Sequence, residues 1–426
     1  MSENGPVSRA TVHGDWAPVG VFPTALPIRV HYHDCLSSRG SEPSAVANLP
    51  NNPQLSFDCV VVGGGVAGAT VALALANRNV RVLVVDEGED GGEATIQAGA
   101  LLAPQFSVPL RSPLFSWAME GFHRFPEYAR ELYDLQRMDM PVRRKGIFVA
   151  NLDEAHAEAA RGVVEAHVAQ GLHAELVEAA DAAQSGACTG GAALSYIWFP
   201  DASVVPGRLL ARALYAALVA KGVSLLQGMR VRRVTGRGGR ATGVELAGGN
   251  RVAAGSVVIA AGLGTRLVAG LPRQIPVQGE AVHVVRGGTW RPDLRPVLGT
   301  PEGAWVARLP NGVGIAAQLG GGLGMGLRPA DVAHGSLRSL VASLVGTELN
   351  RGTKRSFRGH LPVGGDGLPF AGVDPDVSGL AYATGYGSCG FLLAPVLGEA
   401  VARDVLGSTP DTRLLPFRPD RLASCA

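Results

Sequence analysis

Residues 60–87 read VVVGGGVAGATVALALANRNVRVLVVDE, and the order of residue types in this stretch decides the fold class. An apolar run leads into three glycines, a run of small residues follows, and a second apolar run ends on two acids. Gly63 allows a tight turn out of the first strand, Gly65 lets backbone approach a pyrophosphate, and Gly68 lets a helix lie close to the sheet. The stretch predicts a strand–helix–strand unit that binds a dinucleotide.

The two ends of this unit supply the groups that a dinucleotide needs. The start of the predicted helix, at Val66 and Ala67, offers free N–H groups and the positive end of the helix dipole to phosphate oxygens. Asp86 closes the second strand near the ~20-residue spacing expected for a carboxylate that accepts a hydrogen bond from a ribose hydroxyl. We therefore place Asp86 and its neighbour Glu87 at the ribose.

The composition describes a large folded chain. The 426 residues are 46% hydrophobic and 17% charged, which excludes a disordered chain and suffices for two intimately joined domains. The formal net charge is only +2, and no basic run interleaved with aromatic residues occurs. Nucleic acid is therefore not expected as a partner.

The cysteines and the apolar runs indicate the compartment. Five scattered cysteines form no CxxC pair, which fits reduced thiols better than a disulfide framework. No run approaches the ~20 apolar residues of a membrane span, and no signal-peptide pattern opens the chain. We therefore expect a soluble cytoplasmic protein. No metal site is expected, because His31, His33 and Cys35 alternate along one short segment without a fourth ligand.

Hydrophobic periodicity predicts how the rest of the chain is divided. Helical patterns cover residues 116–138, 154–170, 205–218, 335–345 and 392–405, and strand patterns cover 146–150, 223–226, 229–234, 257–261 and 380–384. Residues 276–318 alternate as short β segments, which is typical of an antiparallel sheet. The predicted fold class is α/β, with a discontinuous Rossmann-like domain (56–140, 200–265 and 363–426), an inserted antiparallel β-sheet substrate domain (141–199 and 266–362) and an N-terminal extension (1–55).

Four further stretches carry a family resemblance. They read EATIQAGALLAP (93–104), VVIAAG (257–262), RGHLPVGGDGLPFAG (358–372) and ATGYGSCGFLLAP (383–395). With the glycine unit, they resemble the D-amino-acid oxidase and glycine oxidase family of FAD-dependent oxidoreductases, over roughly residues 56–406. The resemblance implies an FAD cofactor held by Gly63, Gly65, Val66, Ala67, Gly68, Asp86, Glu87, Thr95, Ala98, Gly99, Ala100, Val231, Ala261, Gly262, Gly387, Ser388, Gly390, Phe391 and Leu392.

The small residues in these stretches suit a flat flavin ring. Without bulky side chains, backbone N–H groups reach the ring heteroatoms directly. The helix that follows Gly390 is expected to point its positive dipole end at the N1–C2=O edge of the ring, where negative charge grows on reduction.

Two departures from the family pattern concern the substrate. Glycine-oxidase-like proteins usually read Gly-Leu-Arg-Pro where this chain reads GHLP (359–362), so Leu361 replaces an arginine that helps hold the substrate carboxylate. Ser388 stands where the family often has another such arginine. Neither position therefore offers a guanidinium that could bind a carboxylate through two parallel hydrogen bonds. Either Arg308 or Arg328 binds a carboxylate instead, or the substrate presents no free carboxylate there.

His360 and Tyr386 are the candidate catalytic residues. Their positions in the last two motifs suggest that they orient a substrate amine or exchange a proton with it. Histidine is the side chain whose charge changes most readily near neutral pH. Packed or surface roles for both remain the alternative. A covalent flavin link through Cys389 is disfavoured, because thiol attachments in related oxidases lie on different motifs.

The predicted function is FAD-dependent oxidation of a C–N bond of an amine or amino-acid-derived substrate to an imine. The expected partners are this small amine-type substrate and O2 or another electron acceptor, and a homo-oligomer is compatible with the sequence. Oxidation of a hydroxy acid at its C–O bond is one alternative, although a phosphate or dicarboxylate substrate would ask for clustered Arg or Lys in the β domain, which shows few. A flavin-binding protein without turnover is the other.

Overall fold

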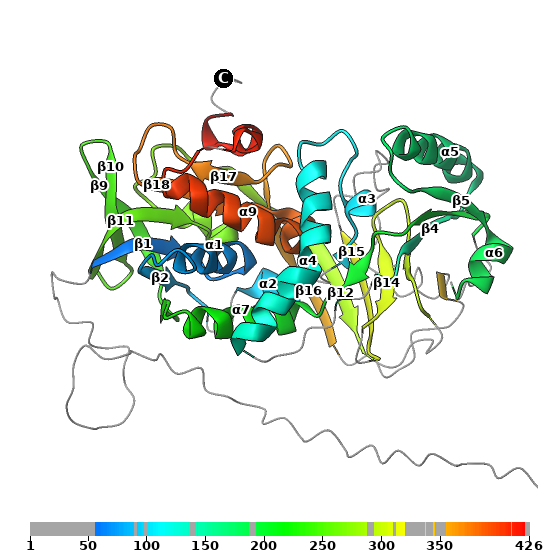
Figure 1. The fold of residues 1–426 in the computed structure, drawn as a ribbon, viewed down its shortest axis with the longest axis horizontal. Helices are drawn as coiled ribbons and strands as arrows, with labels where there is room; N and C mark the ends of the chain where they lie inside the picture. Colours follow the sequence, from blue (N-terminus) through cyan, green and yellow to red (C-terminus); the bar gives the residue numbers. More distant parts are fainter. Residues whose placement is uncertain are drawn as a thin grey trace, which may run out of the picture.

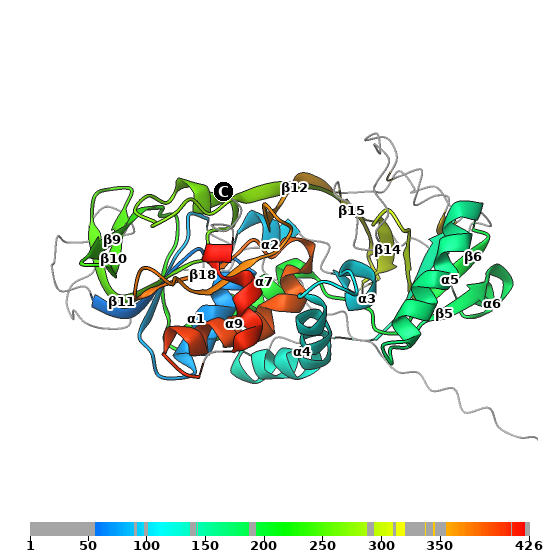
Figure 2. The same cartoon turned by 90° about the horizontal axis from the view of Figure 1, so that it is seen from above.

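The computed structural model describes residues 56–88, 92–97, 101–136, 142, 144–186, 193–287, 294–309, 312–319, 337, 344–345, 355–409 and 411–421. Within them, two eight-stranded sheets lie side by side along the long axis of the molecule (Figures 1 and 2). The predicted N-terminal extension, with His31, His33 and Cys35, lies outside the described residues.

The first sheet is built around the glycine unit. Its strand order is β17-β18-β11-β1-β2-β8, with β17 antiparallel to a parallel set of five. A β9–β10 hairpin pairs with the first half of β11. The strands are β1 (Ser56–Val62), β2 (Val82–Val85), β8 (Ser224–Leu226), β9 (Val231–Arg237), β10 (Arg240–Leu246), β11 (Arg251–Ile259), β17 (Phe370–Val373) and β18 (Leu380–Thr384).

Both faces of this sheet are covered, which explains why β1 and β2 are apolar throughout. Cys59 and Val61 of β1 pack against a helical layer, whereas Val60 and Val62 pack against the β9–β10 hairpin. The helical layer consists of α1 (Val66–Ala76), α4 (Phe115–Gln136), α7 (Gly207–Ala220) and α9 (Gly390–Val405).

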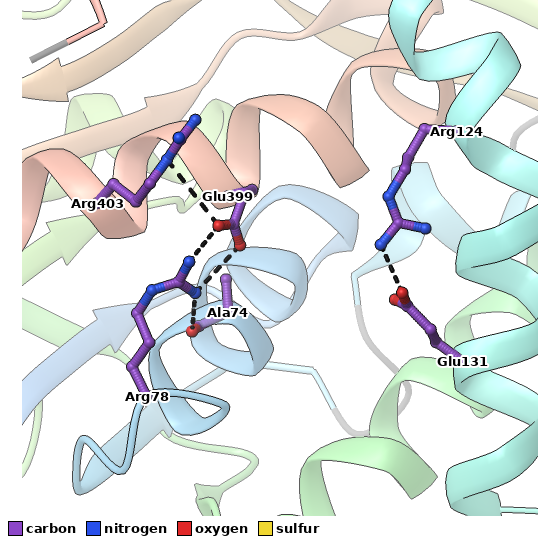
Figure 3. A network of polar contacts seen from close by, with 6 residues as sticks. All are labelled: Ala74, Arg78, Arg124, Glu131, Glu399 and Arg403. Carbon is purple, nitrogen blue, oxygen red and sulfur yellow. Dashed lines mark hydrogen bonds and ion pairs between the residues drawn. The ribbon is translucent and has the colours of Figure 1, made fainter.

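Helices α1 and α9 pack closely because small residues face each other. A Cβ atom added to Gly398 would lie 2.7 Å from Thr70 Oγ1 and 3.0 Å from the Thr70 carbonyl carbon. An ion pair between Arg78 and Glu399 ties the segment that follows α1 to the middle of α9, as Figure 3 shows, and Arg78 Nη1 also donates to the Ala74 carbonyl over 2.9 Å. The two helices therefore form one rigid layer.

The second sheet is mostly antiparallel and has the order β16-β12-β15-β14-β13-β4-β6-β5, with β13 and β4 parallel. Its two faces bury separate apolar clusters, one toward the first sheet and one beneath α6. Its strands are β4 (Ile147–Asn151), β5 (Glu175–Glu178), β6 (Ser195–Phe199), β12 (Val277–Arg286), β13 (Val297–Gly299), β14 (Trp305–Arg308), β15 (Gly314–Leu319) and β16 (Arg355–Gly364).

Short elements complete the described fold. They are α2 (Glu93–Gln97), β3 (Leu101–Leu102), α3 (Pro104–Ser107), α5 (Glu154–Val168), α6 (Ala179–Gln184), β7 (Ser203–Val204) and the 3₁₀ turns η1 (Gly262–Leu267), η2 (Gly387–Cys389) and η3 (Thr412–Phe417). None of the described helices combines the length and apolar character needed to cross a membrane.

The structure confirms the predicted fold class, a Rossmann-like α/β sheet with an inserted antiparallel sheet. Several predicted elements have different starts: α9 begins at Gly390 rather than at residue 392, β9 at Val231 rather than at 229, and β11 at Arg251 rather than at 257. Most of the helix predicted over 335–345 lies outside the described residues. The domain boundaries stay a prediction.

Candidate active site

A cavity of about 550 Å³ lies between the two sheets. One side is formed by the ends of β1 and β2 and by the first turns of α1 and α9, and the other side is formed by Val282, Trp305, Ala317 and Leu361 of the antiparallel sheet. Ligands of open α/β folds bind outside the carboxyl ends of the strands, and this volume is typical of small-molecule sites.

The glycine turn at one end of the cavity leaves no room for side chains. Gly63 has φ +104°, and a Cβ atom there would overlap the Ala260 carbonyl oxygen. A Cβ atom on Gly64 would overlap the Tyr215 hydroxyl, and one on Gly68 would overlap the Gly63 carbonyl. The bare backbone of this turn fits a pyrophosphate. Gly68 itself serves the packing of α1 on the sheet and does not border the cavity.

The first turn of α1 faces the cavity through Gly65, Val66 and Ala67. Gly65 offers no side-chain cap, and the turn carries no acidic residue. The Val66 N–H donates to Thr95 Oγ1 over 3.0 Å, so Thr95 lies at the helix start, where FAD contact is predicted for it. The positive end of α1 therefore remains suited to an anion.

Asp86 and Glu87 both border the cavity but differ in environment. Asp86 is buried, which raises its pKa, and its carboxylate accepts hydrogen bonds from the Gly64 N–H and, over 2.7 Å, from the Gly88 N–H. Each carboxylate oxygen retains acceptor capacity for a ribose hydroxyl. Glu87 is exposed, and its ion pair with Arg230 lowers its pKa. Sequence reasoning missed Arg230, although it directly precedes the predicted contact Val231.

The turn before α9 forms the opposite end of the cavity. Gly385 and Gly387 have φ of +76° and +57°, and the 3₁₀ turn η2 leads directly into α9. Ala261, Gly262, Gly387, Ser388, Gly390 and Phe391 border the cavity as expected.

Leu392 does not line the cavity with its side chain, and its contact with FAD stays a prediction. Its side chain is fully buried in the helical core, and its carbonyl lies so close to Gly121 that a Cβ atom there would overlap it. It does not border the described part of the cavity, because it points toward α4 from the first turn of α9. Ala98, Gly99 and Ala100 lie outside the described residues.

The predicted substrate residues separate into two groups. Leu361 and Ser388 border the cavity, as their place in the motifs suggests. Arg308 does not, because its guanidinium folds back onto its own β14–β15 hairpin, where Nε donates to the Gly312 carbonyl over 3.4 Å. The expectation that Arg308 binds a carboxylate is therefore not supported. Arg328 lies outside the described residues.

His360 and Tyr386 differ in how far they are buried. Residues alternate across β16, so His360, paired with Ala281, lies on the exposed face, whereas Leu361, paired with Glu280, faces inward. His360 nevertheless borders the cavity. Tyr386 is 6% exposed, its burial raises the pKa of the phenol, and its hydroxyl makes no hydrogen bond with any described residue. Their catalytic roles stay a prediction.

Cys389 is an unreactive thiol. Burial, with a smaller contribution from the negative charge of Glu280, raises its pKa to about 12. Its sulfur donates a long hydrogen bond of 3.7 Å to the Ser107 carbonyl. A protonated, buried thiol is a poor nucleophile, which argues against a covalent flavin link. Among the residues that the structure describes, no group of three or more His, Cys, Asp or Glu is arranged to hold a metal ion.

Comparisons with known proteins match this geometry. The family model described as "FAD dependent oxidoreductase" (DAO) matches residues 58–403. The chain is 29% identical to a glycine oxidase of Geobacillus kaustophilus over 377 residues, which cover 85% of this chain and 96% of the relative. It is 28% identical to the hydrogen cyanide synthase subunit HcnC of Pseudomonas aeruginosa over 408 residues, covering 85% and 95%.

Solved structures give the same result. The crystal structure of the glycine oxidase from Geobacillus kaustophilus superposes with a TM-score of 0.79 at 25% identity, covering 86% of this chain and 99% of that one. An iminodiacetate oxidase from Chelativorans sp. BNC1 shares the fold, with a TM-score of 0.73 at 19% identity over 85% and 98% of the two chains. The family match spans both sheets and the cavity between them, so the chain belongs to the FAD-dependent oxidoreductases of the DAO family.

Proposed function

We propose that this FAD-dependent oxidoreductase oxidises the C–N bond of an amine or amino-acid-derived substrate to an imine. The proposal rests on an apolar wall of the cavity, which lies opposite the turn before α9. This wall is formed by Val282, Trp305, Ala317 and Leu361. The curated relatives named glycine oxidase, after an amino acid, add support.

The residues around the cavity fit FAD in both of its halves. The glycine turn and the first turn of α1 would hold the pyrophosphate, and Asp86 would hold the ribose. The turn of Gly387 to Gly390 and the positive end of α9 would face the flavin ring. When bound, FAD supplies an acceptor for a hydride, which is two electrons and one proton.

The chain's own contribution is to bind, orient and desolvate the substrate. The apolar wall excludes water and disfavours the charged ammonium form, because burial of an unpaired charge is costly. A neutral amine has the lone pair that must form the C=N bond as the hydride leaves carbon. Positioning of this C–H bond supplies much of the rate, and no base is required at carbon, because the hydrogen leaves as a hydride. Water then converts the imine to a carbonyl compound and ammonia.

An anaerobic bleaching screen with matched pairs tests this proposal. Each primary amine, from ethylamine to benzylamine, is compared with the alcohol of the same carbon skeleton, and glycine is compared with glycolate. We expect the flavin absorbance to fall with an amine-bearing member and not with its oxygen partner. Bleaching by alcohols or glycolate alone would overturn C–N oxidation, and bleaching by none would favour a protein without turnover.

A further inference from the structure

Glu280 is a carboxylate built into the wall of the antiparallel sheet. It lies on β12 two residues before Val282, so both side chains point to the same face, and it is paired with Leu361 across the strands. Paired residues on neighbouring strands place their Cβ atoms roughly 4.5–5.5 Å apart. Val282 and Leu361 border the cavity, and Glu280, which is not itself among the residues that border it, lies directly beside both of them.

Glu280 also lies within electrostatic range of the turn before α9. Its negative charge contributes to the raised pKa of the Cys389 thiol. Cys389 stands between Ser388 and Gly390, which both border the cavity. The carboxylate thus lies on the same face of the sheet as Val282 and Leu361, within electrostatic range of the turn before α9.

No partner in the structure compensates the charge of Glu280. The side chain is largely removed from solvent, and this desolvation raises its pKa. It makes no hydrogen bond and no ion pair with the described residues. Burial of an unpaired carboxylate costs free energy, and such groups cluster at functional sites.

The other charges around the cavity make this end suitable for a cation. Among the described residues that border the cavity, Arg230 is the only arginine or lysine, and it is paired with Glu87 at the ribose end. His360 lies on the outer face of β16. Glu280 places a negative charge within electrostatic range of the turn before α9, and apolar Leu361 stands beside it.

We propose that the Glu280 carboxylate binds the amino group of the substrate, and that the site thereby selects amines that carry no α-carboxylate. The inference rests on the proposed C–N oxidation and names its substrate class. Val282 and Leu361 would contact the hydrocarbon part of the amine. Transfer of one proton from the ammonium to Glu280 would leave a neutral amine and a neutral carboxylic acid, so no net charge stays buried and the lone pair needed for oxidation is free.

Two ligands of equal shape and opposite charge test the inference without turnover. tert-Butylamine has no hydrogen on the carbon that bears nitrogen, so it cannot be oxidised to an imine, and pivalate is its carboxylate counterpart. The holoenzyme is titrated with each while the visible flavin spectrum and the heat of binding are recorded. We expect tert-butylamine to bind and pivalate to bind at least tenfold more weakly.

Variants of Glu280 assign the effect to this residue. Glu280→Gln should weaken tert-butylamine binding at least tenfold, and Glu280→Asp, which keeps the charge, should retain part of the affinity. The matched control Glu175→Gln changes an exposed glutamate on β5 of the same sheet and should leave the affinity unchanged. FAD content and the thermal midpoint of each variant show whether it is folded.

The outcomes separate the two proposals. Tighter binding of pivalate than of tert-butylamine, or equal amine affinity in folded Glu280→Gln, would overturn the role of Glu280. Neither result depends on oxidation of a ligand. Flavin bleaching by glycolate but by no amine would overturn C–N oxidation, whatever the dead-end ligands show.

Discussion

Leu361 and Glu280 are paired across β16 and β12, and we propose that this pair determines whether the site binds a carboxylate. An arginine introduced as Leu361→Arg would pair with Glu280 across the strands and be neutralised by it. We therefore expect Leu361→Arg alone to gain little affinity for pivalate or glycine. The double variant Leu361→Arg/Glu280→Gln should bind both ligands more tightly than either single variant.

A double-mutant cycle on ligand affinity measures this coupling. Residues in direct contact typically show coupling energies of roughly 0.5–3 kcal/mol. Additive effects of the two substitutions would contradict a direct interaction between positions 361 and 280.

The stability of Glu280→Gln should depend on pH with a defined sign. Because burial raises the folded-state pKa of Glu280, folding favours its protonated form. The stability penalty is absent below the unfolded-state pKa, grows as the pH rises toward the folded-state pKa, and is fully present above it. The facing Cys389 thiol stays protonated across this range, since its pKa is about 12.

Glu280→Gln is therefore expected to raise the thermal midpoint at pH 8, by roughly 1–3 °C, and to leave it nearly unchanged near pH 4. Thermal unfolding of both proteins at the two pH values checks this. A lower midpoint of Glu280→Gln at pH 8 would show that the carboxylate has a stabilising partner.

Tyr386 and His360 should respond differently to substitution, although both were predicted from sequence to orient the substrate. The Tyr386 hydroxyl is buried without a described partner, so a ligand group is its natural one. Tyr386→Phe is expected to slow anaerobic flavin reduction about tenfold, which equals ~1.4 kcal/mol, at unchanged FAD content. The exposed His360→Ala should change the rate less than threefold, and the reverse order in rapid-mixing kinetics would contradict this placement.

Residues whose role is local were predictable from sequence, and residues whose role depends on strand register were not. Gly63 and Gly68 are required by backbone geometry within one turn, which the glycine spacing indicates directly. Glu280 gained its significance only from its pairing with Leu361, about 80 residues away along the chain. Sequence does not show that the Arg308 side chain folds onto its own hairpin, where its Nε donates to the Gly312 carbonyl.

At the level of elements, the close contact of α1 and α9 should contribute more to stability and FAD binding than the ion pair that accompanies it. Both helices begin at the cavity, so their separation would move the two predicted anion-binding ends. Gly398→Val places atoms against Thr70 and should destabilise the protein by about 1–3 kcal/mol, with loss of FAD.

The matched control is the neighbouring Glu399→Gln. It removes a partly exposed ion pair with Arg78 and should cost less than about 1 kcal/mol (Figure 3). Thermal midpoints and FAD content of the two variants check the comparison. A larger loss in Glu399→Gln would mean that charge, rather than the small-residue contact, holds the helices together.

Long periodic elements were predicted well, and their ends were not. Helices α4 and α5 follow their apolar periodicity closely. The start of α9 was placed two residues late, because the 3₁₀ turn of Gly387 to Cys389 continues directly into the helix. Glycines there indicate a turn in sequence, although Gly390 in fact adopts helical dihedral angles.

For the whole molecule, the cavity depends on bringing distant segments together. β4, β5 and β6 join a sheet whose other strands follow more than 75 residues later, and β13 pairs with β4 in parallel. The alternation of residues 276–318 predicted an antiparallel sheet, but not this order, because strand pairing between distant segments leaves no local pattern. The sequence motifs were enough to predict the family, but the apolar wall opposite the turn before α9 could be recognised only in the structure.

The release of ammonia per flavin reduced tests C–N oxidation most directly. The holoenzyme is mixed anaerobically with a primary amine that bleaches the flavin, and ammonia and the carbonyl product are quantified after a single turnover. C–N oxidation predicts one ammonia and one carbonyl product for each flavin reduced, because the imine formed by hydride loss adds water. Flavin reduction without release of ammonia, or reduction by hydroxy acids alone, would contradict it.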